Sequence, residues 1–186
     1  MDTFSMTTTT NTEATTTDTA ALESADGSAL LGSDIGLLIL RVAFGALLVV
    51  HGTQKLFGWF GGYGLSATAK GFGSMGYTPG RFFATLAGLS EVTGGVLLVL
   101  GLLTPLAAAI ALGTMINAVH ASWGQGFSGG YELPLVYALA VAAIAFTGPG
   151  RISLDHGRPW QRSGAAWGLG AAVLAVVAAL ITLAVR

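Results

Sequence analysis

Five side chains inside the apolar stretches of this sequence have the chemistry to bind or react. They are Arg41, His51, Lys55, Glu91 and His120. A charged group at membrane depth costs about 2.5–3.5 kcal/mol on insertion scales, so each charge needs a partner or a water-lined cavity. Glu91 lies near the middle of its apolar stretch, where a carboxyl group can exchange a proton with a substrate or a quinone. We therefore treat Glu91 as the first candidate for a chemical role.

One face of the first apolar stretch brings cations and glycines together. At 100° per residue, four positions fall within about 40° of one another, namely Arg41, Gly45, Gly52 and Lys55. The glycines would let a second helix approach this face, and Glu91 is the acid available at that depth. We expect an Arg41–Glu91 or a Lys55–Glu91 ion pair. Such a pair either takes part in chemistry or only neutralises itself and fixes the helix register.

His51 and His120 lie towards the C-terminal ends of the first and third apolar stretches. Alternate helices of a bundle run in the same direction, so both side chains are expected in the same leaflet. Two histidines from facing helices could ligate a haem iron, or one could donate a hydrogen bond to a quinone carbonyl. They could equally do no more than form hydrogen bonds between helices, together with Asn117 one turn before His120.

The composition indicates which solvent surrounds these groups. Hydrophobic residues make up 53% of the 186 residues, charged residues only 9%, and the mean hydropathy is +0.71. A soluble domain carries about 25% charged residues, so the natural solvent of this chain is a lipid bilayer. The net charge of -1 gives no basic surface for a nucleic acid. Cysteine is absent, which excludes disulfides, thiolate zinc sites and iron–sulfur clusters within the chain.

Five apolar stretches must position the candidate side chains. We expect helices over residues 35–56, 82–103, 106–120, 133–147 and 165–185. A transmembrane helix needs about 20 apolar residues, so the first, second and fifth stretches can cross a bilayer. The third and fourth, at about 15 residues each, are expected to stand untilted or to be partly re-entrant. A stripe of small residues, Gly164, Gly168 and Ala172, suits the fifth helix for docking on another helix.

The segments outside these stretches carry less chemistry. Residues 1–34 are rich in Thr and Ser and contain no Lys or Arg, so we expect a disordered tail rather than a signal peptide. Residues 58–81 are too broken by glycine to span and are expected to lie along one membrane face. Residues 121–132 are free to fold into a cap. Glycine-rich strings at 61–64 and 71–73 lack the strand-to-helix setting of a nucleotide site, and we expect no metal site.

Several ordered motifs together resemble the DoxX family of bacterial integral membrane proteins. They are R-x-x-x-G at 41–45, HGTQKLFGWFGGYG at 51–64, LAGLSEVTGGVLLVLGLLTPLAA at 86–108, GGYELPL at 129–135 and TGPGRISLD at 147–155. The resemblance covers about residues 34–158. It implies an all-α membrane protein, with a DoxX-like four-helix transmembrane bundle over residues 35–158 and one additional C-terminal transmembrane helix within residues 159–186.

The resemblance also implies a location and a set of important positions. It places the chain in a prokaryotic inner membrane as a multi-pass protein, with residues 151–162 inside. The Arg, Lys and Glu positions of the family pattern correspond here to Arg41, Lys55 and Glu91, and His51 belongs to the HGxxKLFG subset. The family name is shared with small subunits of an archaeal thiosulfate:quinone oxidoreductase, and relatives are associated with membrane complexes that handle oxidative and thiol stress.

These observations lead to one leading hypothesis of function and two alternatives. The leading hypothesis is a quinone-facing or anchoring subunit of a membrane redox system, a part of a quinone-linked oxidoreductase rather than a self-contained enzyme. Its cofactor would be a quinone or, alternatively, a haem bound near His51, His120 and Glu91. Its partners would be membrane lipid and a membrane or peripheral redox protein. The alternatives are a non-catalytic membrane scaffold and a small-solute carrier.

Overall fold

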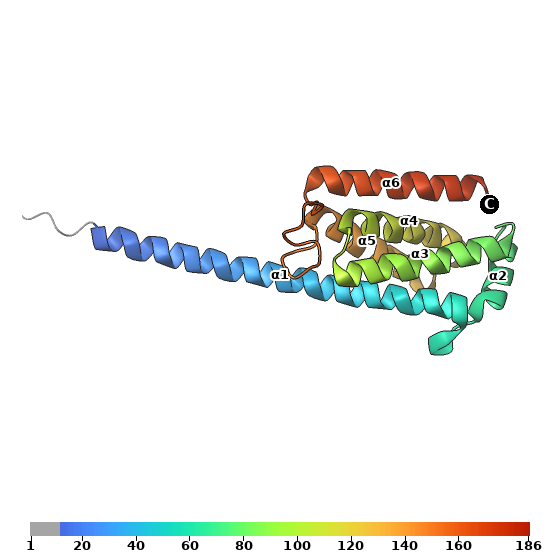
Figure 1. The fold of residues 1–186 in the computed structure, drawn as a ribbon. Coiled ribbons are helices and arrows are strands. Elements are labelled where there is room, and N and C mark those ends of the chain that lie inside the picture. The colour runs from blue at the N-terminus through green and yellow to red at the C-terminus, as the bar shows by residue number, and fades with distance from the viewer. Residues whose placement is uncertain (1–11) are drawn as a thin grey trace, which may run out of the picture.

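The computed structural model describes residues 12–186, and their side chains from residue 29 onwards. This part of the chain contains no strand and folds as six α-helices joined by short helical turns (Figure 1). The α-helices are α1 (Thr12–Phe57), α2 (Gly64–Ser74), α3 (Gly80–Leu100), α4 (Thr104–Ser122), α5 (Glu132–Thr147) and α6 (Ala165–Ala184). The turns are η1 (Trp59–Gly61), η2 (Trp123–Gln125) and η3 (Phe127–Tyr131).

Five helical segments of the described chain are long and apolar enough to cross a membrane, which confirms the predicted all-α membrane fold with five spans. They are Ala29–Phe57, Gly80–Leu100, Thr104–Gln125, Phe127–Thr147 and Ala165–Ala184. The third and fourth spans are 22 and 21 residues long, but they include the turns η2 and η3. The α-helix α5, at 16 residues, agrees with the predicted short helix, whereas α4, at 19 residues, is longer than predicted. The glycines of residues 121–132 indicated a loop, and this segment contains the turns η2 and η3. Within η3 the backbone angles of Ser128, Gly129 and Gly130 are not helical.

The first helix is longer than the sequence predicted. α1 contains 46 residues, about 69 Å at 1.5 Å per residue, and its N-terminal half extends well beyond the bundle (Figure 1). The sequence predicted a disordered tail over residues 1–34, whereas the structure has a helix from Thr12 onwards. Residues 1–11 lie outside the described part. Helical hydrogen bonds are local, so helix formers such as Ala, Leu and Glu can continue α1 without a packing partner.

The helices alternate in direction, so their connections gather at two ends of the bundle. One end, which we call the α2 end, carries α2, η1, η2, η3 and the C-terminus of α6. The other, which we call the loop end, carries residues 101–103 and 148–164. α1 packs mainly on α3, and α6 packs on α4 and α5, so α1 and α6 lie on opposite sides of the bundle (Figure 1).

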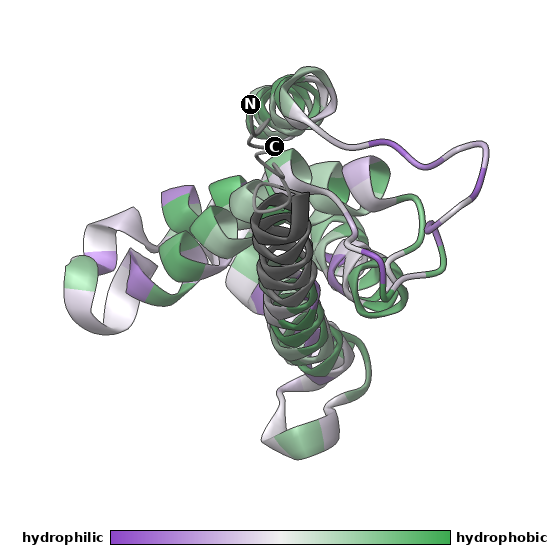
Figure 2. Cartoon of the chain, turned by 90° about the vertical axis from the view of Figure 1, so that its left-hand side faces the viewer, coloured by the Kyte–Doolittle hydropathy of each residue, from purple (hydrophilic) through white to green (hydrophobic). Residues whose placement is uncertain are grey.

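The packing follows the pattern of a protein that faces lipid. Its core is rich in small side chains, with Ala107, Ala108, Ala111, Ala145 and Ala175 at most 1% exposed. Large apolar side chains such as Leu139, Val173 and Leu180 point outwards and are about 60% exposed. Small residues allow close helix contact where lipid gives no hydrophobic drive to associate. Figure 2 shows hydrophobic colour over the bundle helices and hydrophilic colour gathered in the connections.

Small residues also dock α6, and of the three predicted only Gly168 is among them. The buried stripe on α6 is Gly168, Ala171, Ala175 and Ala179. Gly164 is exposed and Ala172 only half-buried, because the contact follows one step of three residues and then two steps of four, rather than steps of four from Gly164. The backbone of Ala175 lies against Gly113, where a Cβ would come within 3.2 Å of the backbone oxygen of Ala175.

Candidate functional site

Two pairs of glycines hold α1 against α3 and set the register between them. A Cβ on Gly45 would lie 2.7 Å from the backbone oxygen of Gly95, and one on Gly52 would lie 2.6 Å from that of Gly88. The two glycines of each helix are two turns apart, so the backbones touch twice along one line. The prediction that the glycine face of the first helix admits a second helix is confirmed.

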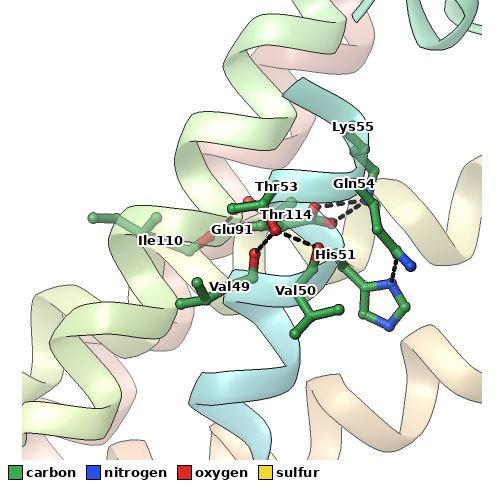
Figure 3. A network of polar contacts seen from close by, with 9 residues as sticks. All are labelled: Val49, Val50, His51, Thr53, Gln54, Lys55, Glu91, Ile110 and Thr114. Carbon is green, nitrogen blue, oxygen red and sulfur yellow. Dashed lines mark hydrogen bonds and ion pairs between the residues drawn. The ribbon is translucent and has the colours of Figure 1, made fainter. Parts of the chain in front are cut away.

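This register brings Lys55 and Glu91 together. Lys55 follows Gly52 by about one turn on α1, and Glu91 follows Gly88 by about one turn on α3. Side chains of a helix lean towards its N-terminus, and in antiparallel helices these two lean towards each other. Lys55 Nζ donates to both carboxylate oxygens of Glu91, at 2.7 Å from Oε1 and 2.6 Å from Oε2 (Figure 3). Of the two expected pairs, Lys55–Glu91 is therefore the one that forms.

The two members of this pair differ in burial. The side chain of Glu91 is 4% exposed, whereas that of Lys55 is 29% exposed. Burying an ion pair is costly unless both charges remain in contact, and removal of one partner strands the other. Glu91 is thus the buried member of the pair, and the Lys55 ammonium is the member that can contact its surroundings.

His51 and Gln54 form a second polar contact on α1 beside the ion pair. The Nε2 of Gln54 donates to the backbone oxygen of Phe60 at 3.1 Å, so its Oε1 is the acceptor that lies 3.1 Å from Nδ1 of His51. This network assigns a proton to Nδ1 and leaves Nε2 of a neutral His51 as an acceptor. The His51 ring also packs edge-on against Tyr137 of α5, with ring centroids 5.9 Å apart.

A cavity of about 280 Å³, which we call the apolar cavity, adjoins the ion pair. Most of its lining is hydrophobic and comes from α2, α3, α4 and α6, including Phe72, Phe83, Leu86, Ala109, Ile110, Ala118, Ala178 and Ala179. Its polar lining residues are Lys55, Ser90, Glu91, Thr114, Asn117 and Thr182. The Oδ1 of Asn117 is buried without a hydrogen-bond partner in the described chain. The cavity therefore suits a mainly apolar molecule with a small polar head.

A second cavity of about 270 Å³, which we call the interface cavity, lies at the α2 end. It is lined by His51, Gln54, Lys55, Gly61, Gly62, Tyr63 and Thr68. Gly62 lies so close to Gln54 that a Cβ there would clash with the backbone of α1. Residues 58–64 therefore pack against the last turns of α1. Lys55 lines both this cavity and the apolar cavity.

Arg41 lies apart from this centre, so the alternative Arg41–Glu91 pair does not form. Its guanidinium is at the loop end, where Nη2 donates to the backbone oxygen of Ile152, and the residue is 1% exposed. Gly101 passes directly over Nη1, and a Cβ at that position would overlap the guanidinium. Within the described chain, Nε and Nη1 of Arg41 have no hydrogen-bond partner. Its charge interacts with that of Asp155.

Asp155 is a buried residue that the motif analysis did not single out. It is 0% exposed, and its carboxylate accepts hydrogen bonds from Leu103 N, Thr104 N and Thr104 Oγ1, each at 2.9 Å, and from Trp160 Nε1 at 3.0 Å. It thereby satisfies free N–H groups at the start of α4, as a capping side chain does. Its place at the end of the TGPGRISLD motif was the signal for it.

Asp34 ties the same loop to α1. Its Oδ1 accepts a hydrogen bond from Arg151 N at 2.8 Å, and its Oδ2 lies 3.6 Å from Arg151 Nε. The loop end thus holds a structural polar network. The charged or titratable groups beside the cavities are Lys55, Glu91, His51, Tyr63 and Tyr77.

The second predicted histidine is not beside the first. His120 is exposed at the end of α4 and lines neither of the two cavities. α1 packs on α3, α2 and α5 rather than on α4, so His51 and His120 do not belong to facing helices. These positions do not fit a haem held between the two imidazoles. Among the described residues, no cluster of three or more His, Cys, Asp or Glu side chains could hold a metal ion.

Comparison with known proteins adds a family signal. The family model described as DoxX matches residues 36–123. The chain is 32% identical over 123 residues to a Bacillus subtilis protein named "Putative oxidoreductase CatD", a match that covers 66% of this chain and 86% of that protein. It is 33% identical over 129 residues to the Escherichia coli protein named "Inner membrane protein YphA", covering 64% and 88%. No solved structure matches the chain. The segment matched by the family model contains Arg41, His51, Lys55, Glu91 and His120.

Proposed function

Because the chain belongs to the DoxX family of membrane proteins, we propose that it is a quinone-facing subunit of a redox system in a bacterial inner membrane. The observation that carries this proposal is the Lys55–Glu91 ion pair in the wall of the apolar cavity. A buried pair that only fixed helix register would need no cavity beside it. A ligand pocket is typically an apolar hollow with a few convergent polar groups, and this cavity has that form.

The cavity fits the ring of a quinone by its chemistry. Its hydrophobic lining matches the ring and the start of an isoprenoid tail, and its polar groups lie where carbonyl or hydroxyl oxygens need partners. The unpaired Oδ1 of Asn117 calls for a donor, because a buried acceptor without one costs about 1–3 kcal/mol. A quinol hydroxyl group can supply that hydrogen bond.

A bound quinone would supply two-electron, two-proton redox chemistry, and the residues of this chain would handle position and protons. The Lys55 ammonium can donate a hydrogen bond to a carbonyl oxygen while it stays in contact with Glu91. The Glu91 carboxylate can accept a proton from a hydroxyl group. Apolar residues from α2, α3, α4 and α6 exclude bulk water from the ring. The extra helix α6 contributes Ala178, Ala179 and Thr182 to that wall.

Electrons would come from a partner protein, since the chain contains no cysteine for thiol redox chemistry. The name of the Bacillus subtilis relative describes an oxidoreductase, which agrees with a place in such a system.

The proposal is tested by quinone binding to the purified protein in detergent. Bound quinones are extracted and identified, and equilibrium dialysis with a radiolabelled short-chain benzoquinone and its quinol measures affinity. We expect saturable binding of at least one form and a roughly tenfold loss in Glu91→Gln, about 1.4 kcal/mol. Glu132→Gln, which changes an exposed acid at the start of α5, is the control and should bind normally. Absence of binding in the wild-type protein would refute the proposal.

An anchoring role is the second candidate, and the loop end favours it. Asp34 and Asp155 hold residues 148–164 in place, and this loop exposes Arg151, Arg158 and Arg162. Three arginines on a fixed loop suit an acidic surface of a peripheral protein. Cross-linking from single cysteines in this loop in native membranes tests the role. A captured partner whose yield falls when the three arginines are replaced by glutamine would support it.

A further inference from the structure

Lys55 lies between two chemically different cavities. It lines the apolar cavity together with Glu91, and the interface cavity together with His51, Gln54, Tyr63 and Thr68. Glu91 lines only the apolar cavity of the two. A proton or a water molecule that enters the interface cavity therefore meets Lys55 before it can meet Glu91.

The interface cavity has the composition and size of a water-filled vestibule. Imidazole, amide, phenol, hydroxyl and ammonium groups surround a volume of about 270 Å³, whereas one water molecule occupies about 30 Å³ in the liquid. A polar cavity of this size fills with water. Its lining includes Gly61, Gly62 and Tyr63 of the connection after α1 and Thr68 of α2, so it lies among the connecting segments of the α2 end. The 29% exposure of the Lys55 side chain agrees with such access.

Apolar packing separates Glu91 from the loop end of the bundle. Between the pair and the loop end the core contains Leu48, Leu98, Val141 and Ile144, each 0% exposed. The backbones of Gly45 and Gly95 touch at the same depth, which leaves no room for a water chain between α1 and α3. At the far end Arg41 is 1% exposed and covered by Gly101 and Ile152.

We propose that Glu91 exchanges protons with one aqueous phase only, the phase at the α2 end, through Lys55 and the interface cavity. The proposal goes beyond quinone binding and holds for any ligand that occupies the apolar cavity. It assigns a direction to the site: protons taken up or released beside the apolar cavity enter or leave on a single side of the membrane.

The transfer balances without an added reagent. An N–H bond of the Lys55 ammonium breaks and an O–H bond of Glu91 forms across the 2.6 Å contact. The Lys55 amine then takes a proton from a hydronium ion in the interface cavity, which leaves a water molecule. The reverse sequence releases a proton to that water. The other titratable groups near the pair are His51 on α1 and Tyr137 on α5, with Tyr77 in the wall of the apolar cavity and Tyr63 in the wall of the interface cavity. α4 presents the uncharged Thr114 and Asn117.

The test follows the carboxyl group itself in sealed vesicles. The infrared C=O stretch of protonated Glu91 is identified by its loss in Glu91→Gln, and is then recorded after a rapid acid jump applied inside or outside. Because the chain has no cysteine, Ser74→Cys at the α2 end and Ser163→Cys at the loop end report vesicle orientation with an impermeant thiol reagent. Both serines are exposed. An entrapped dye confirms that the pH gradient persists during the measurement.

We expect the Glu91 band to respond at least tenfold faster when the acid is on the α2 side. Thr68→Trp, which fills the interface cavity, should slow the response, whereas Thr182→Trp in the apolar cavity should leave its sidedness unchanged. A response from the loop side, an equal response from both sides, or no protonation of Glu91 would each overturn the proposal. Quinone binding that persists in any of these cases would leave the proposed function standing while it removes this inference.

A second measurement does not depend on variants in the apolar cavity. Gln54→Cys keeps the Lys55–Glu91 pair and lines the interface cavity, so a small charged thiol reagent should modify it quickly from the α2 side and at least tenfold more slowly from the other. Thr114→Cys, which lines only the apolar cavity of the two, should react slowly from both sides. Rapid modification of Gln54→Cys from the loop side would contradict the proposed access.

Discussion

Lys55 Nζ lies 2.6 Å from Oε2 of Glu91, across the place where α1 and α3 approach backbone to backbone. The pair joins the two helices that make the largest contact in the bundle. It also forms part of the wall of an apolar cavity that the additional helix α6 helps to enclose. The Lys55–Glu91 contact thus links the register of α1 against α3 to the candidate site.

The two members of the pair should respond differently to substitution. Lys55→Met leaves a carboxylate that is 4% exposed without its partner, and should lower the free energy of unfolding by about 3–5 kcal/mol. Glu91→Gln should cost less, because the partly exposed ammonium can turn towards the interface cavity. The double variant Lys55→Met/Glu91→Leu should recover most of the loss. Unfolding in mixed detergent measures all three, with Lys70→Met on α2 as the control. Equal effects of the two single changes would contradict the assigned burial.

The glycine contacts should tolerate no side chain. Gly52→Val places a Cβ 2.6 Å from the backbone oxygen of Gly88, so α1 and α3 must separate and the Lys55–Glu91 contact must lengthen. We expect a loss of several kcal/mol, of the size seen for overpacked cores or larger. Gly36→Val in the same helix is the matched control, since nothing lies within 4 Å of its Cβ position. Similar melting temperatures for the two variants would argue against the close approach.

Asp155 should stabilise the loop end without affecting ligand binding. Asp155→Ala removes the acceptor for Leu103 N, Thr104 N, Thr104 Oγ1 and Trp160 Nε1. Loss of a cap typically costs about 0.5–2 kcal/mol, and the buried donors left behind add to it. The change should also alter the fluorescence of the tryptophans, because Trp160 loses its partner. Quinone affinity measured at a temperature where the variant is folded should be unchanged. A selective loss of affinity would place Asp155 in the functional site.

Filling the apolar cavity should block its ligand. Ala179 is 1% exposed and lines the cavity, so Ala179→Phe should reduce quinone affinity at least tenfold. The neighbouring Leu180 is 60% exposed on the outer face of α6, and Leu180→Phe is the matched control with unchanged affinity. Equilibrium dialysis compares the two, and melting temperatures confirm that both remain folded. Equal affinities would place the ligand outside this cavity.

Much of the fold was predictable because it depends on local patterns. Apolar stretches predicted five spans, and the helical spacing of Gly45, Gly52 and Lys55 predicted the face that meets α3. The position of Glu91 near the middle of an apolar stretch was enough to identify it as a candidate, because a carboxylate inside the membrane needs a cationic partner. The structure then chose Lys55 over Arg41.

The rest depends on contacts between distant residues, for which one sequence gives little signal. Arg41 and Lys55 share a helix face but lie at different depths, and only the α1–α3 register decides which of them reaches Glu91. Asp155 caps a helix that begins about 50 residues earlier in the chain. The pairing of His51 with His120 failed because it assumed that α1 faces α4. Both cavities require the positions of several elements at once.

The proposed site is tested most directly by photolabelling with an azido-benzoquinone in native membranes, followed by peptide mapping. The predicted result is covalent attachment to apolar-cavity residues such as Phe72, Leu86 and Ile110, suppressed by excess unlabelled quinone and by Ala179→Phe. Attachment confined to outward-facing residues such as Leu139, Val173 and Leu180, with no suppression by quinone, would contradict a quinone site beside Lys55 and Glu91.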